Sequence, residues 1–204
     1  WGDARIDTLM HFSDSTLSLM RASGCKMIFM GAESSSDDTL NLMNKGGTQT
    51  ADLVLEFTKR IKQFDIIPEY SFVLGSPCPD VDRSIEKDIR YIRTIKEINP
   101  KTEIIFYVYA PVLLPGAVIF EEAKKAGFDY PRTLEEWVSP RWQNLDLRKE
   151  SATPWLKPRH INKIRNFERV LNAYYPTVSD LKITQARRTF LRILSGWRYN
   201  LEFY

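Results

Sequence analysis

The sequence predicts an α/β fold in which parallel strands alternate with helices. Three apolar, β-prone runs, at 26–33, 69–74 and 103–109, have the length of buried strands. Helical patterns fill the intervals, so strand and helix recur about every 35 residues, as in βαβ units. Such units pair their strands in parallel through right-handed crossovers. The pattern fits either a stretch of a (β/α) barrel or an open doubly wound sheet, and its few strands suggest half of a larger structure.

Before the first of these runs, residues 1–10 alternate loosely between apolar and polar side chains. This alternation predicts a fourth strand, with Arg5 and Asp7 near its end. A serine or aspartate cap then begins a helix, which Gly24 ends.

The strand predicted over 26–33 ends in Glu33, which three serines follow. Ser35 or Ser36 caps the next helix, and two aspartates lie in its first turn. A single carboxylate therefore stands at the C-terminal end of a buried strand, where parallel α/β proteins bind their ligands. The alternative is a solvated loop residue.

The middle of the chain repeats the same alternation. Its helices carry apolar residues about every 3.6 positions, and glycine or proline turns follow its strands. In order, the predicted elements are a helix over 50–64 that starts at Thr50, a strand over 69–74, a helix that Asp82 caps and that ends at 98, a strand over 103–109 and a helix over 118–126. A capping box, Thr133-Leu134-Glu135-Glu136, then predicts the start of a short helix.

Composition indicates a soluble globular protein, since 43% of the 204 residues are hydrophobic and 27% are charged. No apolar run approaches the ~20 residues of a membrane span. The chain begins at Trp1 without a methionine, which we interpret as the start of an excised fragment. Cys25 and Cys78 form neither a disulfide framework nor a metal-ligand spacing, so we expect a cytoplasmic location. His11 and His160 are isolated and predict no metal site.

Charge divides the chain unevenly. Residues 1–140 hold 16 Lys+Arg against 21 Asp+Glu, whereas residues 141–204 hold 13 against 5. Strand–helix alternation also gives way to helices alone, which predicts an all-helical, basic extension over 141–204. Its last helix, expected from about 180 to 199, combines an apolar stripe with a basic face. That face is either solvated surface beside a packing stripe or a surface for an acidic partner, nucleic acid or anionic lipid, of which nucleic acid is the least expected.

Several short motifs follow one another in a fixed order. They are Gly31-Ala32-Glu33-Ser34, Asn44-Lys45-Gly46, the strand end Phe72-Val73-Leu74-Gly75-Ser76-Pro77, and the turn Pro111…Leu114-Pro115-Gly116, with Trp1, Arg5 and Asp7 before them and Gly127…Pro131-x-Thr-Leu-Glu-Glu-Trp137 after them. Together they resemble the second half of a radical S-adenosylmethionine (radical SAM) domain. The most similar subgroup also binds cobalamin and includes the anaerobic magnesium-protoporphyrin ester cyclase-like proteins. The likeness covers residues 1 to about 142.

The resemblance implies a partial, TIM-like (β/α) barrel, of which residues 1–140 supply the last three or four βα units. It also implies a four-iron (4Fe-4S) cluster held by three cysteines, with S-adenosylmethionine on the open iron. Reductive cleavage would yield a deoxyadenosyl radical for methyl transfer, cyclisation or oxidation of a small-molecule substrate. Cobalamin would require an upstream domain.

The resemblance further implies roles for individual residues. Glu33 would accept hydrogen bonds from the ribose hydroxyls or the ammonium group of S-adenosylmethionine, and Arg5 would hold its carboxylate. The adenine would lie against strand-end backbone, where glycine permits close approach. The implied cofactor-binding residues are Arg5, Gly31, Glu33, Ser34, Leu74, Gly75 and Pro111. The plainer alternatives are an exposed ion pair for Arg5 and turn chemistry for Gly75 and Pro111.

The chain departs from the family at the cluster motif, because it has no C-x3-C-x2-C sequence. Cys25 and Cys78 lie 53 positions apart and cannot replace that motif. We therefore expect this chain alone to be inactive, with the cluster-binding half of the barrel upstream of Trp1. Two other functions stay open, a non-catalytic α/β scaffold for a nucleotide or partner and a basic tail for an acidic partner. We also expect self-association, or C-terminal helices that cover the open barrel through Phe190 and Trp197.

Overall fold

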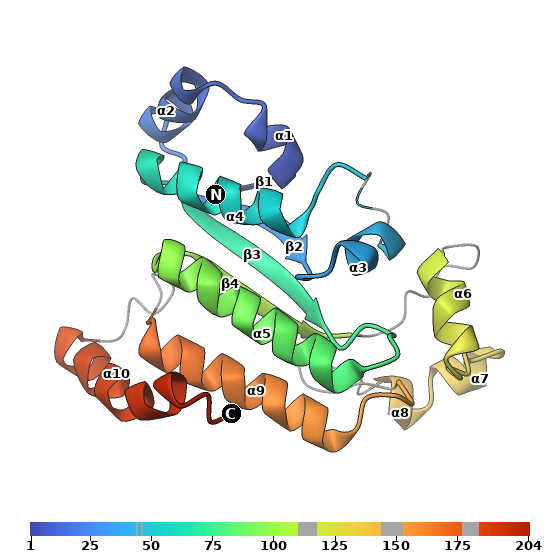
Figure 1. The fold of residues 1–204 in the computed structure, drawn as a ribbon. Coiled ribbons are helices and arrows are strands. Elements are labelled where there is room, and N and C mark those ends of the chain that lie inside the picture. The colour runs from blue at the N-terminus through green and yellow to red at the C-terminus, as the bar shows by residue number, and fades with distance from the viewer. Residues whose placement is uncertain (44, 46, 110–117, 144–152, 177–183) are drawn as a thin grey trace.

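The computed structural model describes residues 1–43, 45, 47–109, 118–143, 153–176 and 184–204, and it has the predicted α/β architecture (Figure 1). Its sheet contains four parallel strands in the order β1-β2-β3-β4, so neighbours in the sheet are also neighbours in the sequence. The strands are β1 (Gly2–Asp3), β2 (Met27–Glu33), β3 (Ile67–Leu74) and β4 (Glu103–Val108).

A layer of four helices covers one face of this sheet. The helices α1 (Ile6–Met10), α4 (Ala51–Ile61), α5 (Val81–Ile98) and α9 (Pro158–Tyr174) pack against one another in that order. Alternate strand residues point into the layer. Tyr70 hydrogen-bonds Thr58 of α4 through its hydroxyl at 3.1 Å, and Phe106 of β4 meets Phe167 of α9 edge to face at 5.7 Å between ring centroids. The buried core therefore lies between the sheet and these helices.

Among the described residues, those on the opposite face of the sheet are buried less completely. Asp3, Phe29, Glu69 and Glu103 stand side by side in the strand register. Phe29 and Glu69 are only half-buried, and Glu69 accepts a hydrogen bond from the indole of Trp1 at 3.2 Å. This face thus mixes apolar and acidic side chains.

The remaining helices lie around this core (Figure 1). They are α2 (Asp14–Ala22), α3 (Asp37–Leu42), the 3₁₀ turn Lys62–Phe64, α6 (Val118–Lys125), α7 (Leu134–Trp137), α8 (Pro140–Gln143) and α10 (Gln185–Asn200). The last of these packs on α9. Buried residues of α9 belong to the same hydrophobic cluster as the strands, so the core continues across the predicted boundary at 140.

The helix caps follow the predicted chemistry at Ser36, Thr50 and Thr133. Each of these side chains accepts a hydrogen bond from the backbone amide three positions later in the chain. The cap of α5 is Asp80 rather than the predicted Asp82, because the Asp80 carboxylate accepts from the backbone amide of Arg83 at 3.0 Å. The cap therefore lies two positions earlier than expected.

The predicted strand over 1–10 is wrong in most of its length. Only Gly2 and Asp3 pair with β2, and a helix begins at Ile6. Ile6 and Leu9 are 0% and 2% exposed, and their spacing of three places both on one face of a helix. Burial of this pair outweighs the weak alternation that favoured a strand.

The predicted orientation of the last helix is also wrong. Phe190 and Trp197 are 60% and 55% exposed, so they cover no part of the sheet. The helix α10 instead contacts α9 through Tyr199, whose ring stacks on Tyr174 at 4.3 Å between centroids. Arg93 of α5 also lies 4.5 Å from the Tyr199 ring centroid. This aromatic contact sets the face that α10 turns inward.

Candidate functional site

Glu33 ends the second strand in an unusual backbone conformation. Its φ is +66°, and the pairing of β2 with β3 shifts register between Gly31 and Glu33. Few residues other than glycine adopt this left-handed conformation, which costs about 1–3 kcal/mol in folded proteins and is concentrated at functional sites. The backbone conformation thus sets the orientation of the Glu33 side chain at the C-terminal end of the strand.

The Glu33 side chain folds back over the strand. A Cβ added at Gly31 would lie 2.1 Å from Glu33 Oε1 and 2.7 Å from Lys45 Nζ. The absence of a side chain at 31 therefore makes room for an ion pair.

That pair joins Glu33 to Lys45 at 2.8 Å between Oε1 and Nζ. The two side chains are 16% and 24% exposed, so solvent screens their attraction less than it screens a surface pair. Because each side chain keeps some solvent contact, the carboxylate stays accessible to a ligand that displaces the lysine.

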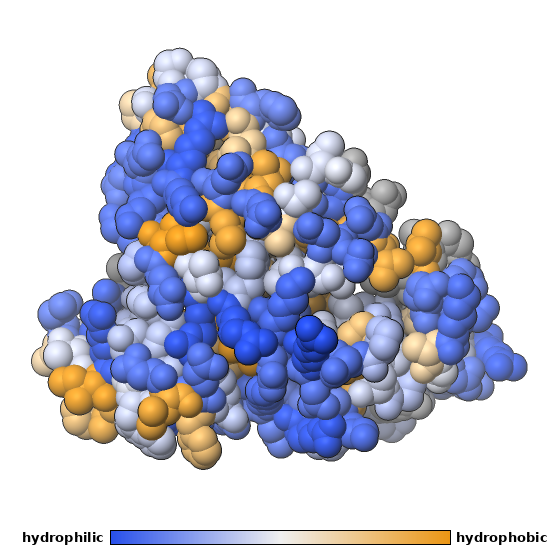
Figure 2. All heavy atoms as spheres, in the orientation of Figure 1, coloured by the Kyte–Doolittle hydropathy of each residue, from blue (hydrophilic) through white to orange (hydrophobic). Residues whose placement is uncertain are grey.

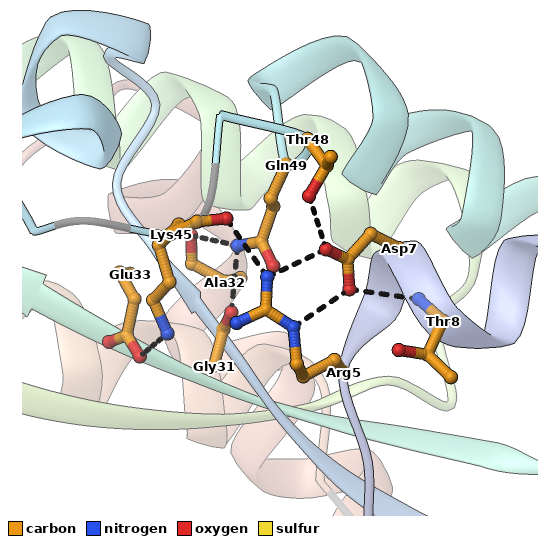
Figure 3. A network of polar contacts seen from close by, with 9 residues as sticks. All are labelled: Arg5, Asp7, Thr8, Gly31, Ala32, Glu33, Lys45, Thr48 and Gln49. Atoms are coloured by element: carbon orange, nitrogen blue, oxygen red, sulfur yellow. Dashed lines mark hydrogen bonds and ion pairs between the residues drawn. The ribbon is translucent and has the colours of Figure 1, made fainter.

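Arg5 and Asp7 form a second ion pair beside the first (Figure 3). Arg5 donates through Nε and Nη2 to both carboxylate oxygens of Asp7, at 3.0 and 2.6 Å. This bidentate bond holds the pKa of Asp7 well below its usual range, and the hydroxyl of Thr48 and the amide of Thr8 act in the same direction. Arg5 Nη2 also donates to the Lys45 carbonyl at 2.9 Å, so Lys45 connects both pairs.

Gln49 joins the segment between α3 and α4, which also contains Lys45, to β2 through hydrogen bonds. Its amide nitrogen donates to the carbonyls of Gly31 and Ala32 at 2.8 and 3.4 Å, and its side chain is buried. Figure 3 shows Arg5 and Asp7, from the start of α1, and Lys45 and Gln49, from the segment between α3 and α4, lying together beside the end of β2. The network therefore fixes the segment after α3 over the end of the strand.

Ser34 points away from this network and into the helix layer. Its hydroxyl donates to Asp88 of α5 at 3.2 Å, and Ser35 donates to the same oxygen through its amide and hydroxyl at 2.8 and 2.7 Å. Asp88 is 2% exposed, and this burial raises its pKa despite the serine donors. Ser34 thus helps to hold the turn after Glu33.

Gly75 has a positive φ of +86°, which fits the turn chemistry given as its plainer alternative, and its close neighbour is another part of this chain. An added Cβ would lie 2.6 Å from the side chain of Leu156, and Trp155 donates its indole N–H to the Gly75 carbonyl at 3.0 Å. Leu74 is buried. Pro111 lies outside the described residues.

The structure therefore brings three of the predicted residues together, namely Arg5, Gly31 and Glu33. It joins them to two that sequence reasoning left without a role, Lys45 and Gln49. Lys45 lies in Asn44-Lys45-Gly46, one of the short motifs on which the resemblance was based, whereas no local pattern marks Gln49. Asp88 could have been found as the one carboxylate on an isoleucine-lined face of its helix.

Comparison with known proteins adds no assignment, because no protein-family model and no curated protein matches the chain. Within the part of the chain that the structure describes, no group of three or more His, Cys, Asp or Glu side chains is placed to hold a metal ion. In the same part, no helix has both the length and the apolar character needed to cross a membrane.

Proposed function

We propose that the C-terminal ends of β1 and β2 bind S-adenosylmethionine, and that the chain is part of a radical SAM enzyme. The observation that carries this proposal is Glu33, whose backbone is strained and whose carboxylate lies over Gly31 at the end of a parallel strand. Strain of this kind supports a functional role when surrounding contacts over-determine it, as Lys45 and Gln49 do here.

The charges in the network are complementary to those of the proposed ligand. Arg5 is 51% exposed and presents a guanidinium suited to a carboxylate. Glu33 accepts from Lys45 at 2.8 Å, and a ligand ammonium or a pair of ribose hydroxyls would replace that donor. The carboxylate and the ammonium group of an amino-acid cofactor thus meet opposite charges just after β1, at Arg5, and at the end of β2, at Glu33.

The sheet topology supports a barrel rather than a doubly wound fold. Strands in sequential order with one helix layer are the arrangement of a (β/α) barrel, whereas a doubly wound sheet carries helices on both faces. We infer that β1–β4 are the last units of a partial barrel, whose interior is the face holding Phe29 and Glu69.

The iron–sulfur cluster does not fit the residues of this chain. Cys25 and Cys78 are single half-buried thiols, and burial raises the pKa of Cys78, opposite to what a thiolate ligand needs. Three cysteines would have to come from residues outside this sequence, as would any cobalamin site. Bound S-adenosylmethionine supplies radical chemistry in this family, and the residues here would bind and orient it.

The test is S-adenosylmethionine binding by calorimetry with the Glu33→Gln variant. Loss of a charged acceptor costs about 1.5–3 kcal/mol, so we expect affinity to fall about tenfold to a hundredfold. Glu86→Gln is a matched control, because Glu86 also pairs with a lysine, Lys163, at 2.7 Å but lies on the outer surface of α5. Equal affinity of Glu33→Gln and the unmodified chain would contradict the proposed site.

A second candidate is a non-catalytic nucleotide-binding scaffold, favoured by the missing cysteine motif. Anaerobic reconstitution with iron and sulfide separates the two candidates when it is done on the chain alone and then on the chain with the proposed cluster-binding half. For the chain alone we expect no stoichiometric iron and no cluster absorbance after desalting. Adding the proposed cluster-binding half should restore both in a radical SAM enzyme, and failure to do so would favour the scaffold.

A further inference from the structure

One side of α10, together with its C-cap residue, presents several large apolar side chains to solvent. Its large side chains recur three and four positions apart, so they share one helix face. They are Phe190, Ile193, Leu194, Trp197 and Leu201, which are 60%, 70%, 51%, 55% and 74% exposed. Figure 2 shows orange side chains gathered over α10 at the lower left. We call these five residues the α10 stripe.

The stripe is not the surface through which α10 joins the protein. Ser195 and Tyr199 are the buried residues of the helix, and Gly196 lets the Tyr174 ring approach to 3.6 Å of where a Cβ would stand. Phe203 extends the exposed surface, since its ring stacks on Trp197 at 5.8 Å between centroids. Within the described residues, the contacts of α10 with α9 thus leave the stripe uncovered.

Positive charge accompanies the stripe. The helix carries four arginines and no acidic residue, and helical spacing places Arg187 and Arg198 directly beside the apolar side chains. Across residues 153–176 and 184–204, nine Lys+Arg stand against two Asp+Glu. Of these two acids, Glu202 already pairs with Arg93 at 3.1 Å.

We propose that α10 binds an anionic lipid surface, lying in the plane of the membrane interface with the α10 stripe inserted. Helices of this kind combine Trp, Phe and Leu on one face with Lys or Arg beside it. Anionic headgroups would complement Arg187 and Arg198, and Trp197 with Phe203 would occupy the headgroup level that aromatic rings prefer.

Charge also favours lipid over a second copy of this chain. A two-fold contact through the stripe would bring each copy's arginines toward those of the other. Like charges repel across such an interface, and the helix carries no carboxylate to offset them. This inference is independent of the proposed function, since α10 lies apart from the Glu33 network.

The experiment is co-sedimentation of the full chain with vesicles of phosphatidylcholine and phosphatidylglycerol in equal amounts, compared with pure phosphatidylcholine. We expect strong binding to the anionic vesicles only, weakening as sodium chloride rises from about 0.1 to 0.5 M. Arg187→Gln combined with Arg198→Gln should lower the affinity for anionic vesicles about 25-fold, about fivefold for each charge removed. Equal binding to both vesicle types would overturn the proposal.

The apolar contribution is tested with Ile193→Ser combined with Trp197→Ser, which should weaken binding about a hundredfold. Leu19→Ser is the matched control, since Leu19 is 66% exposed on α2 and should not contribute. Both substitutions change exposed side chains, so circular dichroism should show an unchanged fold. The lipid proposal would also be overturned if the chain does not bind anionic vesicles but forms a dimer in ultracentrifugation. Loss of that dimer in the variant with Ile193→Ser and Trp197→Ser would assign the stripe to contact with a second copy.

Discussion

Gly31 is the position where the Glu33–Lys45 pair rests against the backbone. The atoms nearest an added Cβ are Glu33 Oε1 at 2.1 Å and Lys45 Nζ at 2.7 Å, both at the ends of flexible side chains. The φ of Gly31 is not positive, so alanine meets no backbone strain there. Glycine at position 31 is therefore needed to make room for the Glu33 carboxylate rather than for the backbone conformation of the strand.

We accordingly expect Gly31→Ala to separate function from stability. The free energy of unfolding should change by no more than about 1 kcal/mol, roughly 2–4 °C in Tm, because alanine also restricts the unfolded chain. Affinity for S-adenosylmethionine should fall as far as in Glu33→Gln. Gly75→Ala is the contrasting control, since φ there is +86° and Leu156 lies 2.6 Å from the new Cβ. A Tm loss for Gly31→Ala as large as for Gly75→Ala would contradict this account.

The helix α5 carries a buried ammonium group near its C-terminal end. Lys96 is 1% exposed and donates to the carbonyls of Pro100 and Thr102 at 2.8 and 2.5 Å. Burial lowers its pKa to about 8. The lysine thus supplies hydrogen bonds to backbone carbonyls in the connection between α5 and β4.

This depressed pKa predicts how stability depends on pH. Between about pH 8 and the unfolded value near 10.5, the unfolded chain binds more protons than the folded chain, so the free energy of unfolding rises with pH. Chemical denaturation at pH 8.0 and 9.5 should detect a gain of about 1–2 kcal/mol. The pKa values of Cys78 and of the buried tyrosines are raised, so these groups act in the opposite direction, the thiol above about pH 9 and the tyrosines above about pH 10. Lys96→Met should abolish the rise, and a slope unchanged in that variant would assign it to another group.

Elements were predictable where a local signal and tertiary packing agree. The runs that form β2, β3 and β4 are apolar and β-prone, and the caps at Ser36 and Thr133 follow from side-chain chemistry. Periodicity shows which residues share a helix face but not which face is buried, so the orientation of α10 was missed. The Glu33 network depends on register between distant segments, including Arg5 with Lys45, which no local pattern contains.

The helix α9 completes the helix layer although it follows the predicted boundary at 140. It contacts both α5 and β4, and four of its apolar side chains are buried in the common core, namely Ile164, Phe167, Val170 and Leu171. Upstream of it, Trp155 and Leu156 close over Gly75 at the end of β3. The basic C-terminal part therefore supplies core as well as surface.

Truncation tests whether residues 1–140 fold without this helix. Each fully buried side chain of this type contributes about 1.5–3 kcal/mol, so the four in α9 contribute about 6–12 kcal/mol. That amount is comparable with the whole stability of a typical domain, about 5–15 kcal/mol. We expect a chain of residues 1–140 to be unfolded or aggregated by circular dichroism and light scattering. A chain of residues 1–176 should keep a cooperative unfolding transition at reduced Tm, because α10 packs on the outside of α9. A folded, monomeric chain of residues 1–140 would show instead that the α/β part is a domain in its own right and that α9 is an addition to it.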